Sequence, residues 1–197
     1  MGHREDLLEG AKRCLLEKGF VRTTARDIVK ESGTNLASIG YHYGSKDKLL
    51  AEAYVSLIEG LSDDFLPAAE TSGGDTEPGS LDRFQEVWSN IIATMQGPGS
   101  MWRLSVEIVA MGDQLPAVRD HLALAQREAA RGLVPLFFGG REEDVPEGDV
   151  DSVGQFYNTL MTGLICQYVF DPATAPTADQ LTEGLRRVIG AAADGRK

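Results

Sequence analysis

The hydrophobic residues of this chain recur with the period of an α-helix along nearly its whole length. Near the start, for example, Leu7, Ala11 and Leu15 are four residues apart and form one apolar stripe. No segment shows the strict alternation of apolar and polar residues that is typical of a half-buried strand. These patterns predict an all-α fold.

Glycine, proline and polar clusters divide the helical pattern into separate segments. Four helices are expected before Pro67, the last of them a long one over 45–66, and residues 67–80 have the composition of a loop. Further helices are expected at about 81–96, 101–111, 117–138, 151–170 and 178–193. We predict two domains, residues 1–47 and residues 48–197.

Composition excludes several classes of protein. The chain has 197 residues, of which 42% are hydrophobic, so disorder over its whole length is excluded. No stretch approaches the roughly 18 uninterrupted apolar residues of a membrane-spanning helix, and charged side chains begin at residue 4, where a secretory signal would need an apolar core. We therefore expect no membrane partner and a cytoplasmic location.

Two cysteines, Cys14 and Cys166, lie far apart in apolar periodic segments. We expect both to be buried free thiols rather than a disulfide or a reactive site. Together with the three histidines they give no metal-ligand spacing, so neither a metal nor a cofactor is expected.

Charge is unevenly distributed along the chain. Residues 1–50 hold 9 Lys/Arg and 7 Asp/Glu, a net charge of +2, whereas residues 51–197 hold 10 and 23, a net charge of −13. A mildly basic unit beside an acidic body suits a protein that touches phosphate with one end only. This pattern is weak alone and gains weight from the helices of the basic segment.

Two short helices joined by a glycine turn follow the first helix. Thr24 begins the first of them with a capping-box-like partner three residues later, and Gly33 ends it. Asn35 can cap the next helix, which Gly44 ends, and Ser45 can cap the fourth. Two helices of about eight residues around a glycine turn have the size of a helix-turn-helix. The second of these helices carries small and polar side chains on one side, which is unlike a buried structural helix.

At residues 22–54, RTTARDIVKESGTNLASIGYHYGSKDKLLAEAY, the sequence resembles the DNA-binding domain of the tetracycline-repressor (TetR) family. The Thr-Thr start, the short apolar-rich helix, the glycine turn and the run Tyr-His-Tyr-Gly-Ser-Lys all match that family's pattern. The resemblance is specific over residues 5–54, and beyond them only the number and length of the helices are similar. The sequence departs from the pattern at Val29, Thr34 and Gly40.

This resemblance implies a set of DNA contacts. Thr24 and Lys46, at two helix starts, are expected to contact phosphates, and Tyr41 and His42 to reach the DNA backbone. The residues expected to face base edges in the major groove are Asn35, Leu36, Ala37 and Ser38. Three of these residues have a structural alternative: Thr24 as an N-cap only, His42 as a packed ring and Lys46 as a solvated side chain. Tyr43 is expected in the core.

In that family, the part of the chain that corresponds to the acidic body is a ligand-binding and dimerisation domain. Our candidates for contact with a small, largely apolar effector are Trp88, Trp102, Glu107, Met111, Tyr157 and Met161. The alternative for each apolar one is the core; Glu107 is expected either on a solvated face or in the pocket. Helices 117–138 and 151–170, with small residues such as Gly154 and Gly163, are expected to form a four-helix bundle between two subunits. The alternative is that they pack only within one chain.

The function that follows is a ligand-responsive transcriptional regulator, of the repressor type, that binds palindromic double-stranded operator DNA as a homodimer. An effector would tilt the long helix over 45–66 and change the spacing of the two recognition helices. The alternative is a DNA-binding adaptor of the same fold without a small-molecule ligand. We expect no enzyme, because the sequence lacks the nucleotide-binding, metalloprotease and hydrolase motifs.

Overall fold

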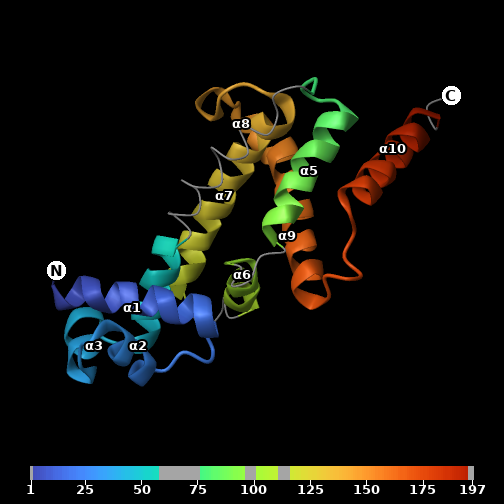
Figure 1. The fold of residues 1–197 in the computed structure, drawn as a ribbon. Helices are drawn as coiled ribbons and strands as arrows, with labels where there is room; N and C mark the ends of the chain where they lie inside the picture. Colours follow the sequence, from blue (N-terminus) through green and yellow to red (C-terminus); the bar gives the residue numbers. More distant parts are fainter. Residues whose placement is uncertain (1, 58–75, 96–100, 111–115, 195–197) are drawn as a thin grey trace. The chain divides into compact units, whose positions relative to one another are not determined.

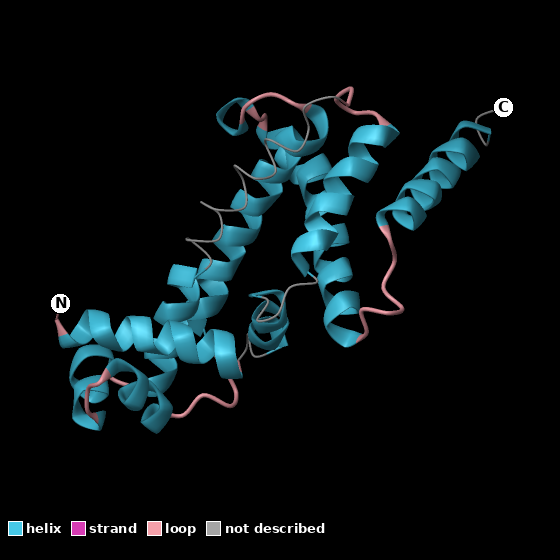
Figure 2. Cartoon of the chain, viewed as in Figure 1, coloured by secondary structure: helices cyan, strands magenta, loops and turns pink. Residues whose placement is uncertain are grey.

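A computed structural model describes residues 2–57, 76–95, 101–110 and 116–194. Throughout these ranges the chain is helix and loop, and they contain no strand (Figure 2). This confirms the all-α prediction. Contacts group the described residues into two compact units. Residues 2–57 form the first with 101–110 and the start of the following helix, and residues 76–95 and 126–194 form the second.

Helix α1 of the first unit (His3–Lys18) packs across α2 (Ala25–Ser32) and α3 (Leu36–Tyr43), as Figure 1 shows. A fourth helix is described over 46–57, and α6 (Met101–Ala110) also contacts α1. These bounds confirm the four N-terminal helices as far as residue 57; the rest of the long helix expected over 45–66 lies outside the described residues. The largest fully buried side chains of this unit are Leu7, Leu15, Phe20, Ile28, Leu49, Leu50, Tyr54 and Ile108.

Helices α1 and α2 approach each other closely at Gly10. A Cβ on this glycine would lie 2.8 Å from the Ser32 Cβ and 3.2 Å from the Ile28 carbonyl oxygen. Two ion pairs also join the helices: Lys18 Nζ lies 2.6 Å from Asp27 Oδ1, and Arg13 Nε lies 2.6 Å from Glu31 Oε1. The relative position of α1 and α2 is therefore fixed by close backbone packing and by charge.

The second unit contains α5 (Leu81–Met95), the later part of α7 (Pro116–Phe138), α9 (Gln155–Phe170) and α10 (Ala178–Asp194). A short 3-10 turn η3 (Glu142–Asp144), a turn α8 (Glu147–Asp149) and a π-helical turn η4 (Val150–Gly154) precede α9. Helical structure thus begins a few residues earlier than the expected 151–170. The core is aromatic: Phe84, Trp88, Phe137 and Tyr157 form a cluster in which the last two rings stack at 3.7 Å.

Glycine allows a second close approach within this unit. A Cβ on Gly154 would lie 2.4 Å from the carbonyl oxygen of Ala130 on α7. Gly154 therefore serves packing inside one chain, whereas we expected it between subunits. By contrast, nothing lies within 4 Å of a Cβ placed on Gly163.

The two cysteines differ in environment. Cys14 is buried in the first unit, as expected, and burial raises the pKa of its thiol. Cys166 on α9 is a free thiol but exposed, so its predicted burial is wrong for the single chain. Among the described helices, none is both long enough and apolar enough to cross a membrane.

Candidate nucleic-acid interface

The start of α2 is built around Thr24. Its Oγ1 accepts a hydrogen bond from the Asp27 amide at 3.2 Å, and Asp27 Oδ2 accepts from the Thr24 amide at 2.9 Å and from its hydroxyl at 2.6 Å. The predicted capping box is confirmed. Because the Thr24 hydroxyl donates to Asp27, the remaining donors at this helix end are the first amides of α2, which lack intrahelical acceptors.

Asp27 links the ends of two helices. Its other carboxylate oxygen accepts from Lys18 Nζ at 2.6 Å, at the last turn of α1. The hydrogen bond from Lys18, followed by those from Thr24, holds the pKa of Asp27 far below the usual range of an aspartate. The carboxylate therefore remains charged while it fixes α2 to α1.

Helix α3 has one buried and one exposed face. Ile39 and Tyr43 are buried, whereas Leu36 is 53% exposed and Tyr41 is 86% exposed. Ala37 and Gly40 lie on the exposed side, and a Cβ on Gly40 would meet nothing within 4 Å. The exposed face of α3 thus carries two large side chains, Leu36 and Tyr41, and two small residues. It can therefore approach another surface closely.

The polar residues predicted on α3 lie at its start. Asn35 is exposed, and its Oδ1 caps the helix by accepting from the Ser38 amide at 3.1 Å. The Asn35 amide nitrogen remains a donor, since only the oxygen is used. Ser38 is half-buried. The structure thus places the four residues expected to face bases on the first turn of one helix; their contact with DNA stays a prediction.

Tyr41, His42 and Tyr43 take three different positions. His42 is half-buried, with its ring edge-on to Tyr41 at 4.8 Å. Tyr43 is in the core, as expected, and its hydroxyl donates to the Arg4 carbonyl at 2.6 Å. Burial raises the pKa of this tyrosine. Of the two tyrosines, Tyr41 is largely exposed and Tyr43 is buried.

Lys46 begins the helix over 46–57. Its Nζ donates to the Thr23 carbonyl at 3.3 Å and lies 3.2 Å from Asp47 Oδ1. The side chain therefore ties the fourth helix to the residue that precedes Thr24. A lysine ammonium has three donors, so this arrangement leaves capacity for a phosphate.

Four cations of the first 50 residues have no acidic partner among the described residues: Arg22, Arg26, Lys30 and Lys48. All four are exposed. Sequence reasoning missed them as candidates for phosphate contact. A count of acids and bases along the chain does not reveal which pairs cancel, and here five of the nine cations are paired with acids.

The residues expected around an effector are divided between the two units. Trp88, Tyr157 and Met161 are buried in the second unit, and burial raises the pKa of Tyr157. Trp102 and Glu107 lie half-buried on α6 in the first unit. Met111 lies outside the described residues. Glu107 is half-buried, and its carboxylate accepts a hydrogen bond from the Phe20 amide, a contact that neither expectation included.

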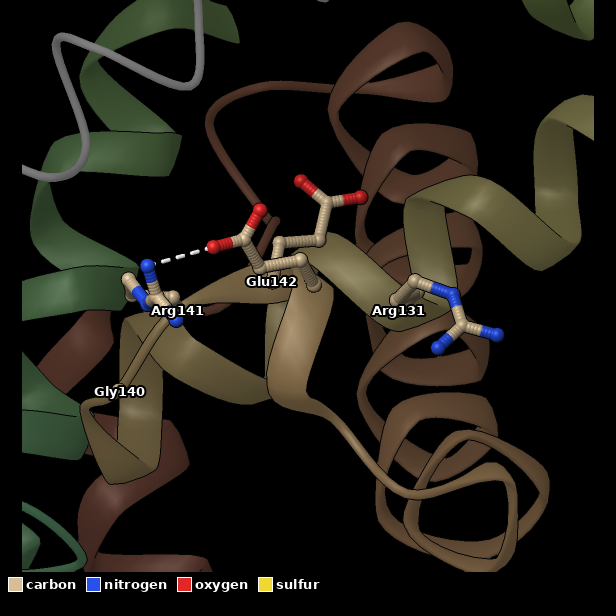
Figure 3. Close-up of a pocket in the computed structure, with 5 residues that line it drawn as sticks. Arg131, Gly140, Arg141 and Glu142 are labelled. Carbon is tan, nitrogen blue, oxygen red and sulfur yellow. Dashed lines mark ion pairs between the residues drawn. The ribbon is translucent and has the colours of Figure 1, made fainter.

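A surface pocket in the second unit is formed by other residues. Arg131, Gly140, Arg141, Glu142 and Glu143 line it. Figure 3 shows that charged side chains dominate this pocket and that Arg141 forms an ion pair there. Arg141 is paired with Glu143 and Asp144, and Arg131 with Glu147. None of the five effector candidates that the structure describes lines this pocket.

Comparisons with known proteins agree with this geometry. The sequence profile described as "Bacterial regulatory proteins, tetR family" matches residues 7–53. The HTH-type transcriptional repressor AcnR of Corynebacterium efficiens is 39% identical over 46 residues. That match covers 23% of this chain and 24% of the repressor, so the chain matches about a quarter of the length of this curated relative.

Solved structures match over nearly the whole chain. The multidrug binding protein EbrR, solved in complex with proflavin, is 19% identical, with a TM-score of 0.70 and coverage of 94% of this chain and 99% of that one. A TetR transcription regulator from Haloarcula marismortui is 20% identical, with a TM-score of 0.62 and coverage of 98% and 97%. The family profile falls on α1 to α3 and the helix over 46–57, and the fold agrees beyond them. Residues 7–53 thus match the TetR family of bacterial regulatory proteins, and the fold of the chain is similar to that of solved TetR regulators.

Proposed function

We propose that the chain is a transcriptional repressor that binds palindromic operator DNA as a homodimer and is released by a small, largely apolar molecule. The exposed face of α3 is the observation that carries this proposal. Leu36 and the Ala37 methyl are suited to thymine methyl groups, while small Gly40 permits close approach to the groove. The AcnR relative, a repressor by name, supports the sign of regulation.

Electrostatics supports contact with phosphates at this end of the chain. The unpaired Arg22, Arg26 and Lys48 flank the starts of α2 and the fourth helix, where free amides also favour anions. Since residues 51–197 carry a net charge of −13, the attraction is confined to residues 1–50.

Selection of genomic duplex fragments at low salt tests DNA binding. We expect a tightly bound inverted repeat whose affinity falls steeply with salt. Lys46→Ala should weaken binding similarly on all sequences and reduce the salt slope by about 1, whereas Lys12→Ala, which removes the same charge from a pair with Glu9, should change it less. Recovery of no fragment at low salt would refute the DNA-binding proposal.

The proposed dimer uses α9 together with α7. Phe156, Thr159, Gly163 and Phe170 are exposed and lie three, four and seven residues apart, so they share one side of α9. Phe170 is 90% exposed and Phe156 is 49% exposed, so this side of α9 carries two exposed aromatic rings. A charged replacement at Gly163 or Leu160 should give monomers that lose operator binding. A wild-type chain that sediments as a monomer at micromolar concentration would contradict the dimer.

An effector site in the second unit is supported by one unsatisfied donor. Trp88 is fully buried, and its Nε1 has no hydrogen-bond partner among the described residues. A buried N–H of this kind is costly unless something accepts from it. We infer an effector that combines an apolar body with a hydrogen-bond acceptor. The structural neighbour EbrR was solved with a small aromatic molecule, proflavin, which we take as the first probe.

Linkage makes the effector proposal testable. A ligand that releases DNA must bind the free form better, and DNA must weaken the ligand by the same factor, about 5–150-fold for a coupling of roughly 1–3 kcal/mol. The assay is quenching of tryptophan fluorescence by proflavin, with and without the selected operator. Equal ligand affinities in the two titrations would contradict release by this ligand, and if no molecule of the class binds, the adaptor without a ligand becomes the better proposal.

A further inference from the structure

Helix α6 places one acidic side chain against the turn between α1 and α2. Glu107 Oε2 accepts a hydrogen bond from the Phe20 amide at 2.9 Å, across 87 positions of sequence. A Cβ on Gly19 would lie 2.6 Å and 2.7 Å from the two carboxylate oxygens. Gly19 also has φ of +80°, which favours glycine. The carboxylate and this glycine turn are therefore in direct contact.

The turn that Glu107 holds leads to the residues we assign to phosphate contact. The buried Thr23 hydroxyl donates to the Gly19 carbonyl at 2.7 Å, and Lys46 Nζ donates to the Thr23 carbonyl. Thr24 follows immediately as the N-cap of α2. A continuous set of hydrogen bonds thus runs from Glu107 through the turn to Lys46 and to the start of α2.

Packing fixes α6 in this position. Leu104 and Ile108, on the helix turns that flank Glu107, are buried in the same core as α1 and the fourth helix. Ser105 hydrogen-bonds with the buried Tyr54 of that fourth helix. Phe20 is itself buried, so its amide has little access to water and depends on the Glu107 carboxylate for an acceptor.

We propose that Glu107 is a positioning residue for DNA binding: it holds the α1–α2 turn in the conformation that presents α2 and Lys46 to phosphates. The inference rests on the proposed DNA-binding function. The change in DNA affinity that it predicts on loss of Glu107 is opposite in sign to the change expected from charge alone. Removing the negative charge of Glu107 beside the basic residues 1–50 should strengthen binding to a polyanion, whereas loss of the turn's acceptor should weaken it.

Two substitutions separate these effects. Glu107→Gln removes the charge and keeps a carbonyl oxygen that can accept from the Phe20 amide; Glu107→Ala removes both. Val109→Ala is the matched control, because Val109 is an exposed residue of the same helix. Affinity for the duplex selected by the wild-type chain is measured over a series of salt concentrations. Amide exchange at Phe20 is followed in the same variants, below their unfolding temperatures.

We expect Glu107→Gln and Val109→Ala to bind at least as tightly as the wild-type chain. Glu107→Ala should bind about tenfold more weakly, as for loss of a hydrogen bond to a charged group, with a salt slope smaller by about 0.9 for each phosphate that the variant no longer neutralises. Phe20 should exchange faster in this variant alone. Binding by Glu107→Ala at or above wild-type strength, or weaker binding with an unchanged salt slope, would overturn the inference. If the wild-type chain selects no duplex, the proposed DNA-binding function is refuted. If amide exchange at Phe20 is the same in Glu107→Ala as in the wild-type chain, the inference about Glu107 is overturned, whatever the result of the DNA selection.

Discussion

Leu36→Ala should separate recognition from folding. Leu36 is 53% exposed at the start of α3, so its truncation should change the free energy of unfolding by no more than about 0.5 kcal/mol. On DNA the same change removes the exposed large apolar side chain of the first turn of α3, since Ile39 of that turn is buried. If this side chain contacts a thymine methyl, the loss should be of the size of one mismatched base pair, about 1–3 kcal/mol, or roughly 5–150-fold in affinity.

Ile39→Ala is the control on the opposite face of the same helix. Ile39 is buried beside the α1 and α2 contacts, so truncation should lower the free energy of unfolding by about 2–5 kcal/mol. Any loss of DNA binding by this variant should then follow its loss of folded protein, whereas the loss in Leu36→Ala should occur in a fully folded chain.

The assay pairs urea unfolding with duplex selection for each variant. We expect Leu36→Ala to recover sites with relaxed preference at one position of each half-site, with the others retained. Unchanged affinity and unchanged preference in Leu36→Ala would refute α3 as the base-reading helix. Unfolding as severe as that of Ile39→Ala would refute the assignment of Leu36 to an exposed face.

Three further predictions concern stability and are measured by urea unfolding. Gly10→Ala places a Cβ 2.8 Å from a side-chain carbon of α2; compared with Gly40→Ala, an open helical position with the same gain in helix propensity, it should be less stable by about 1–3 kcal/mol, and equal stabilities would contradict the close contact. Gly154→Ala should be destabilised by about 1–3 kcal/mol or more, because its Cβ would lie 2.4 Å from a backbone oxygen of α7, whereas Gly184→Ala, in open space, should not. The pKa of Asp27 is lowered in the folded chain, so its contribution is present at neutral pH and is lost as pH falls through and below the usual aspartate range; Asp27→Asn should flatten the profile between roughly pH 5 and 2, and an unchanged acid limb would count against the Lys18–Asp27–Thr24 network.

Features that depend on neighbours in sequence were predictable. The caps at Thr24, Asn35 and Ser45 are hydrogen bonds within three residues, and the structure contains each of them. The resemblance to a known family likewise implied that Tyr43 is in the core, and the structure confirms its burial. These are local choices, and a single sequence carries the information that determines them.

Features that depend on distant contacts were not predictable. The hydrogen-bond partner of Glu107 is a backbone amide 87 residues away in the sequence. The residue against which Gly154 packs, Ala130, is on another helix. An apolar pattern also does not reveal whether a given position packs inside its own chain or faces solvent. Cys166 lies in a periodic segment and was predicted to be buried, but it is exposed. The effector residues were chosen by type alone, and they belong to two separate units.

Footprinting of the selected duplex with hydroxyl radicals tests the central claim most directly. Two α3 helices related by a two-fold axis should protect two patches whose centres lie about 34–36 Å apart, one turn of DNA or a multiple of it. The base pairs of the two patches should form an inverted repeat, and Leu36→Ala should alter both patches alike. A single protected patch, or two patches in direct repeat, would contradict recognition by a symmetric pair of these helices.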